Sequence, residues 1–200
     1  MSQELTKETI EKLLSIKGET RGVALKTDEK FILREKGEEG LKMVEDELVK
    51  IGHPIKYSEI NSMDFYPISL RILSILVIQK VFYFDEKKIK EMGAAAPKVS
   101  MMIKLFMQYF LSLKKTFEQV SKMWRKHYTA GEVEVGELDE KNKKIIIMLK
   151  NADFHPIFCI YLNGYFLSIL EMIVKASGLC QETKCSFKGD KYHEFYLKWQ

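Results

Sequence analysis

Apolar residues recur with two periods along the chain, and these periods predict helices in the first two thirds and strands nearer the end. Apolar positions three or four residues apart mark residues 5–16, 28–51, 67–84, 86–92 and 97–124. Alternation of apolar and polar residues marks strands at 183–187 and 193–199, and β-branched residues, among them three consecutive isoleucines, mark strands at 132–138 and 144–150. Between these strands, residues 156–174 are apolar almost throughout, which is typical of a buried helix.

Capping and breaking residues set the expected ends of several helices. Thr6 is a favourable N-cap for the first helix, and Gly37 interrupts the second. Gly93 is expected to end the short helix 86–92, and Pro97 to begin the next one.

The last two strands are expected to form a hairpin. If Cys185 and Phe187 share the core face with Phe195, the register places Cys185 opposite His193. Residues 188–190 then form a three-residue loop in which Gly189 supplies a positive φ. A two-residue turn would instead put Cys185 and His193 on opposite faces of the hairpin.

The order of elements is several helices followed by β-β-α-β-β. This order predicts an α+β fold in which N-terminal helices pack on a four-stranded antiparallel sheet at the C-terminal end. We expect a single domain over residues 1–200, with a mainly helical part (1–128) and a ligand-binding core (129–200).

Composition narrows the class of protein. A hydrophobic content of 46% with 30% charged residues is globular, and a net charge of +4 does not demand nucleic acid. Three cysteines form no disulfide framework and favour a cytoplasmic location. The two longest apolar stretches are interrupted by polar residues, Arg71 in the first and Glu171 in the second. We therefore expect no transmembrane segment.

Two stretches of sequence resemble known families. GYFLSILEMIVKASG followed by ETKCSFKGDKYHEF resembles the C-terminal signature of the four-vinyl-reductase domain, with His193 where that family has its second cysteine. The matching residues are Glu182, Lys184, Cys185, Gly189, Asp190, Tyr192 and Phe195. FILREKGEEGLKMVEDEL followed by DFYPISLRILSILVI is similar to the N-terminal helices of heme–nitric-oxide-binding domains and to an uncharacterised bacterial family. The first two families share a superfamily with the TRAPP small subunits.

The resemblance implies a pocket for a small, largely apolar molecule between helices and sheet, and often a homodimer. A fatty acyl chain or a similar compound is the expected ligand. The Tyr-x-Ser-x-Arg motif with which the heme-binding group holds propionates is not found, so a heme-based gas sensor is a less favoured alternative. No cysteine matches the acylated cysteine of the TRAPP subunits.

Large apolar side chains on the expected helices are candidates for the pocket wall, because aromatic and methionine side chains suit ligand cavities. These candidates are Ile72, Ile75, Met102, Phe106, Tyr109, Phe110, Phe158, Tyr161 and Tyr165. The alternative is that these side chains fill an ordinary core, in which case the protein would be a dimeric interaction scaffold.

A zinc site is the second candidate, because thiolate and imidazole are preferred zinc ligands. Cys185 and His193 face one another across the expected hairpin, and Cys180, Cys159 or His155 could complete the site. Cys180 and Cys185 lie five positions apart, however, on opposite faces of a straight strand. The alternative is a free cysteine packed as a small apolar residue.

Catalysis has little support in the sequence. His155 and Cys159 lie one helical turn apart and could act as base and nucleophile, but no third residue is identified that would orient them. Binding or sensing without catalysis is therefore the function that we expect.

Overall fold

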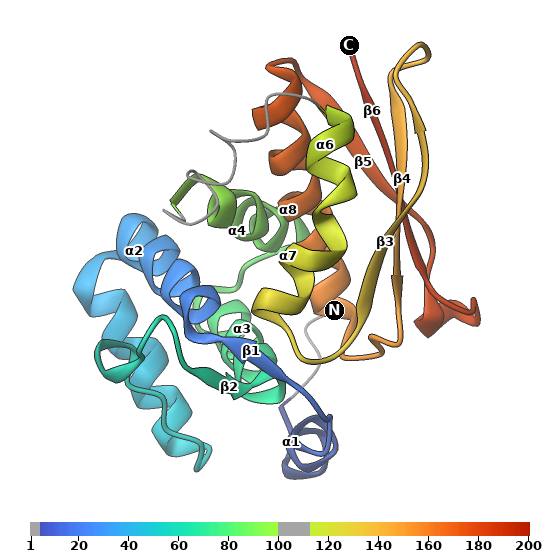
Figure 1. Cartoon of the computed structure of the whole chain (residues 1–200). Coiled ribbons are helices and arrows are strands. Elements are labelled where there is room, and N and C mark those ends of the chain that lie inside the picture. Colours follow the sequence, from blue (N-terminus) through green and yellow to red (C-terminus); the bar gives the residue numbers. More distant parts are fainter. Residues whose placement is uncertain (1–4, 100–112) are drawn as a thin grey trace.

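The computed structural model describes residues 5–99 and 113–200. Four C-terminal strands form one sheet, and the helices lie against one of its faces (Figure 1). The sheet order is β3-β4-β6-β5, with every neighbouring pair antiparallel. The predicted α+β architecture is confirmed.

The strands of this sheet are β3 (Glu132–Asp139), β4 (Lys144–Lys150), β5 (Gly178–Lys184) and β6 (His193–Trp199). Side chains alternate in the two central strands, as a half-buried sheet requires. The buried residues are Ile145, Ile147, Leu149, His193, Phe195 and Leu197. This alternation turns one apolar face toward the helices.

Helix α8 (Pro156–Val174) lies on the apolar face of the sheet and has the bounds predicted from its composition. It begins where Pro156 occupies the first turn and His155 Nδ1 accepts a hydrogen bond from the Ile157 amide. Phe166 packs edge-on against Phe195 of β6, with ring centroids 5.1 Å apart. Burying one such side chain contributes about 2 kcal/mol.

Helix α4 (Glu86–Val99) crosses α8 and corrects one prediction. Gly93 does not end the helix, and Pro97 lies inside it. The reason is tertiary: a Cβ built on Gly93 would lie 1.9 Å from the Tyr161 carbonyl oxygen of α8. The glycine permits close contact between two helices rather than marking a helix end.

The N-terminal part contains α1 (Lys7–Leu14), β1 (Glu19–Arg21), α2 (Gly22–Lys50), a 3₁₀ turn η1 (Tyr57–Glu59), β2 (Phe65–Pro67) and α3 (Ile68–Phe82). Thr6 caps α1 as predicted, and α2 is kinked at Gly37, where φ is 68°. The pairing of β1 with β2 was not predicted, because each strand has only three residues. The chain continues with α6 (Leu113–Glu118) and α7 (Val120–His127).

The hairpin between β5 and β6 differs from the expected register. Lys184 pairs with Glu194, and the ladder shifts between Glu182 and Lys184, so Cys185 is not the ladder partner of His193. The connection is longer than three residues and contains a 3₁₀ turn η2 (Ser186–Lys188), followed by Gly189 at φ 98°. Phe187, expected on the core face, is 41% exposed because the 3₁₀ turn carries it out of the strand.

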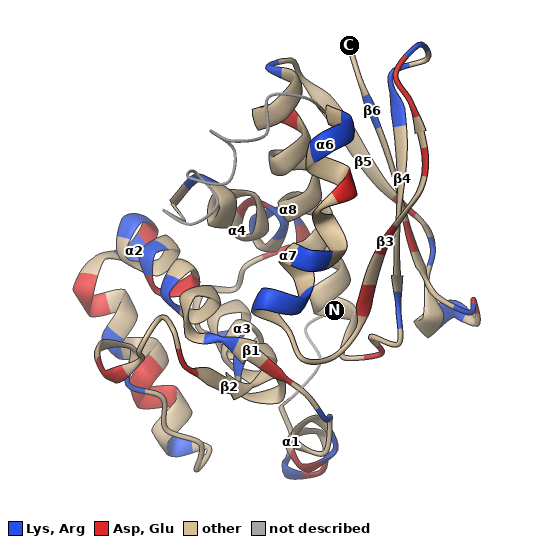
Figure 2. Cartoon of the chain, in the orientation of Figure 1, with Lys and Arg blue, Asp and Glu red and all other residues tan. Residues whose placement is uncertain are grey.

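Charged residues follow the outer turns of α2, α6 and α7, whereas α8 is almost free of them (Figure 2). By length and composition α8 could cross a membrane, but 50% of its most apolar window is buried in the protein. The central helix of a folded core has the same properties.

Candidate functional site

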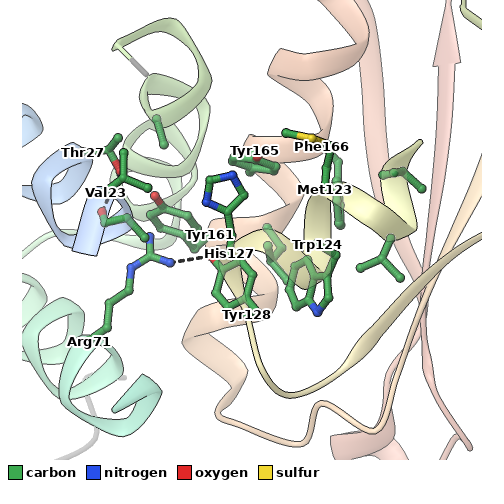
Figure 3. A pocket seen from close by; sticks show the side chains of 15 residues that line it. Val23, Thr27, Arg71, Met123, Trp124, His127, Tyr128, Tyr161, Tyr165 and Phe166 are labelled. Carbon is green, nitrogen blue, oxygen red and sulfur yellow. Dashed lines mark hydrogen bonds between the residues drawn. The ribbon is translucent and has the colours of Figure 1, made fainter. Parts of the chain in front are cut away.

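A cavity of about 80 Å³ lies where the N-terminal helices meet α7 and α8 (Figure 3). Its wall is largely apolar and includes six aromatic rings, which is the usual character of a ligand site. The lining residues come from α2, α3, α4, α7, β3 and α8: Val23, Ala24, Thr27, Arg71, Ala96, Val120, Met123, Trp124, His127, Tyr128, Val133, Tyr161, Leu162, Tyr165 and Phe166.

One side of the cavity is formed by a buried ion pair. Arg71 donates from Nε to Asp28 Oδ2 at 2.8 Å and from Nη2 to Oδ1 at 3.2 Å, and both side chains are 1% exposed. Tyr161 also donates to Asp28 Oδ1, and Tyr128 accepts from Arg71 Nη1 at 2.7 Å. Burial disfavours the charge on Arg71, yet Asp28 and the two tyrosines raise its pKa above the ordinary value. The guanidinium is therefore charged and already paired.

His127, the last residue of α7, lies on the cavity wall between Arg71 and Trp124 in Figure 3. Its Nε2 atom is buried and has no hydrogen-bond partner among the described residues. Burial, together with the positive charges of Arg21, Arg71 and Lys126, lowers the pKa of His127 to about 4. The imidazole is thus neutral at neutral pH and can hydrogen-bond a guest in the cavity.

Of the nine residues that the sequence proposed for the pocket wall, the five in the described part of the chain lie in three different places. Tyr161 and Tyr165 line the cavity, whereas Ile72 and Ile75 are fully buried in the core and do not. Phe158 lies behind the wall, stacked on Tyr161 with centroids 6.0 Å apart. The other four, Met102, Phe106, Tyr109 and Phe110, lie outside the described residues. His127 was not proposed, since only the tertiary structure places the end of α7 at the cavity.

A second cluster joins the first turn of α8 to the β5–β6 hairpin. Ligand atoms of Cys159, Glu182, Cys185 and His193 all lie within 4.8 Å of one another. His193 Nδ1 is 3.1 Å from Glu182 Oε1 and 3.5 Å from Cys159 Sγ. Four ligands around a tetrahedral zinc ion lie roughly 3.3–3.8 Å apart, so the cluster is close to the arrangement that zinc requires.

The other ring nitrogen of His193 is also held. Ser186 Oγ lies 2.8 Å from His193 Nε2, which fixes the ring with Nδ1 toward the two cysteines. In metal-binding histidines, a hydrogen bond to the ring nitrogen that does not bind the metal usually orients the ring in this way. Because the same four side chains can hydrogen-bond one another, a metal-free polar cluster is the alternative.

The two thiols of the cluster stay protonated when no metal is bound. Burial raises the pKa values of the Cys159 and Cys185 thiols above the ordinary range. Burial works in the same direction on Glu182, but hydrogen bonds from His193, Cys159 and Cys185 hold the pKa of that carboxyl below its ordinary value. A metal would therefore have to displace the thiol protons.

The cluster contains Cys185 and His193, which the sequence proposed as zinc ligands, but not Cys180. Cys180 is buried in β5 outside the cluster, where desolvation raises its pKa to about 12. The other two positions are taken by Cys159, which the sequence also offered as a ligand, and by Glu182, which appeared only in the pattern shared with four-vinyl-reductase domains. His155 caps α8 and is not in the cluster.

Comparison with known proteins identifies the fold. No family model and no curated protein matches the chain. An H-NOX protein from Shewanella oneidensis in the Fe(II)NO state superposes with a TM-score of 0.69 at 13% identity, over 90% of this chain and 99% of that one. An unliganded Fe(II) H-NOX variant from K. algicida gives 0.65 at 12% identity, over 90% and 96%. At such identities the likeness shows the fold alone.

A TRAPP complex subunit 3 from Naegleria fowleri, covalently bound to palmitic acid, gives a TM-score of 0.49 at 18% identity, over 66% of this chain and 93% of that one. This similarity is too low to carry an argument. The two H-NOX superpositions, by contrast, show that the chain has the fold of H-NOX proteins. The narrower resemblance to four-vinyl-reductase domains stays a prediction.

The described lining does not fit a heme. The cavity of about 80 Å³ is roughly half the volume of an engineered cavity that holds benzene, and a porphyrin is several times larger than benzene. His127 Nε2 is an unpaired nitrogen among the described residues, but Arg71, the only Lys or Arg in the described lining, is already paired with Asp28. Two propionates would find no free partner charge there.

Proposed function

We propose that this protein binds a small, largely apolar molecule in the cavity beside His127 and acts as a carrier or sensor without catalysis. The observation that carries the proposal is a buried imidazole nitrogen that has no hydrogen-bond partner in residues 5–99 and 113–200 and lies in a largely apolar, aromatic wall. Leaving such an atom unpaired costs about 1–3 kcal/mol, which a hydrogen bond from a guest would recover.

The dimensions of the cavity limit the guest. A compact molecule fits, whereas a fatty acyl chain, the ligand expected from sequence, would place only its end inside. The wall joins α2, α7 and α8, which belong to different parts of the chain. A guest that altered the packing of these helices would therefore change the position of α2 relative to α8 and the sheet.

Xenon is a suitable first probe, because it is smaller than benzene and also enters apolar cavities without specific polar contacts. Trp124 lines the cavity, and the chain has only one other tryptophan, so a Trp199→Phe background makes fluorescence report on Trp124 alone. We expect a saturable change in emission with a Kd on the order of 1 mM.

Filling the cavity tests whether the signal comes from this site. Ala24→Leu adds side-chain volume to the wall and should weaken xenon binding at least tenfold, which corresponds to about 1.4 kcal/mol. Ala176→Leu makes the same change beyond the end of α8, outside the lining, and should leave binding unchanged. A linear, non-saturable response in all three proteins would contradict the proposal.

We propose as a second function that Cys159, Glu182, Cys185 and His193 bind one zinc ion. The convergence of four ligand atoms from α8, β5, the residue that precedes η2, and β6 supports it. Such a centre would tie the core helix to the end of the sheet, and its binding free energy would add to that of folding.

Zinc content and its pH dependence test this proposal. Because two thiols must lose protons, affinity should rise by roughly a hundredfold per pH unit near neutrality, measured by competition with a chromophoric chelator. Cys159→Ser should lower affinity by at least about a hundredfold, whereas Cys180→Ser, a buried cysteine outside the cluster, should not. Equal losses in both variants would indicate a folding defect rather than lost ligation.

A homodimer, a cytoplasmic location and a single domain divided near residue 128 stay predictions of the sequence. Sedimentation equilibrium of the purified chain tests the first of them directly.

A further inference from the structure

We infer that the zinc centre has one exchangeable position, occupied by Glu182 and open to a groove between α4 and α8, where a small anionic thiol can bind. This inference rests on the second proposed function. The groove measures about 330 Å³. Its lining residues are Glu86, Lys87, Lys90, Cys159, Ile160, Asn163 and Glu182.

The four ligands of the cluster are not equivalent. Cys159, Cys185 and His193 are 7%, 5% and 1% exposed, whereas the Glu182 side chain is 18% exposed and faces the groove. Two thiolates and an imidazole are ligands that zinc prefers, and a carboxylate is the harder, weaker member of the set. Two cysteines and one histidine also form the protein part of a known kind of catalytic zinc site, which leaves the fourth position free.

The groove itself has groups that suit an incoming anion. Asn163 Oδ1 is buried in the groove wall without a hydrogen-bond partner among the described residues. Rotating the Asn163 side-chain amide by 180° exchanges its oxygen and nitrogen at no steric cost, so the NH₂ group can face a ligand in the groove. Lys87 and Lys90 border the groove beside Glu86, and no ion pair of either lysine is found in residues 5–99 and 113–200. With Glu182 bound to the metal, the two ammonium groups outnumber the one free carboxylate of the lining. A small thiol that also carries a carboxylate could bind the zinc through its sulfur and the two lysines through its carboxylate.

The exchange involves no oxidation or reduction. The thiol loses its proton and a zinc–sulfur bond forms, while the zinc–oxygen bond to Glu182 breaks. The proton passes to the released carboxylate or to water. The centre then has three thiolates and one imidazole, a combination typical of stable zinc sites.

Cobalt(II) in place of zinc makes the exchange visible, with mercaptoacetate as the probe. Thiolate-to-cobalt charge-transfer intensity should rise by about one half, because the number of thiolates increases from two to three. Acetate at the same concentration should leave the spectrum unchanged. Bound cobalt with a spectrum that mercaptoacetate does not alter would overturn the inference and leave the metal proposal standing. Failure to bind cobalt or zinc would overturn both.

Two changes at Glu182 sharpen the test. Glu182→Ala removes the competing ligand and should bind mercaptoacetate at least about tenfold more tightly. Glu182→Cys supplies the third thiolate from the protein, so it should show the higher intensity without added thiol and no longer respond to it. A response of Glu182→Cys equal to that of the original chain would show that the thiol binds elsewhere.

The basic rim has its own control. Replacing Lys87 and Lys90 by alanine should weaken mercaptoacetate binding about three- to tenfold at low salt, with little effect on the uncharged 2-mercaptoethanol. Equal effects on both thiols would contradict the role of the lysines.

Discussion

Replacing Gly164 by alanine is expected to destabilise the protein by about 3 kcal/mol. A Cβ at this position would lie 1.9 Å from the Lys90 carbonyl oxygen and 3.0 Å from the Ala94 amide nitrogen. Both are backbone atoms of α4, so no side chain can move aside. The added methyl group must therefore push α4 and α8 apart, and Gly93 on the opposite helix is under the same constraint.

Urea unfolding measures this loss, and the chain contains a matched control. Gly136→Ala in β3 places a Cβ 3.3 Å from Ile146 Cγ2 and 3.4 Å from the flexible end of Met148. We expect that change to stay within about 1 kcal/mol. An unaltered midpoint in Gly164→Ala would show that the two helices are not in backbone contact.

Replacing Arg71 by methionine is expected to destabilise the protein by about 3–5 kcal/mol, because it leaves the Asp28 carboxylate buried without a countercharge. Within the described part of the chain, Asp28 would keep only the side-chain hydrogen bond from Tyr161, at 3.1 Å. Since a buried carboxylate can escape this penalty by taking up a proton, the loss should be smaller at low pH than at neutral pH.

Removing both charges should cost much less than removing one. Asp28→Leu combined with Arg71→Met replaces a desolvated ion pair by apolar side chains, a change that is often nearly neutral. The exposed pair of Lys42 and Asp46 on α2 is the control, where Asp46→Ala should cost less than about 1 kcal/mol. A double variant as unstable as Arg71→Met would mean that the ion pair is not the source of the loss.

The same double variant bears on the cavity. Arg71 lines it, so its replacement makes the wall more apolar while His127 stays in place. Comparing xenon binding in the double variant and in the original chain separates the contribution of the ion pair from that of the other lining residues.

Local sequence patterns determined much of the secondary structure. The bounds of α8, the N-cap at Thr6 and the strands β3 and β4 follow from residues within a few positions of one another. Capping, periodicity and apolar composition act over that range. The α+β class follows in turn from the order of the elements.

Only the tertiary structure decided what lies at the two sites. Gly93 has the sequence signature of a helix end and lies inside a helix, because the contact with α8 outweighs its low helix propensity. Asp28 and Arg71 are 43 residues apart, and His193 is 34 residues from Cys159. Periodicity assigns a side chain to a face of its element, but only the packing of elements against one another determines which faces meet.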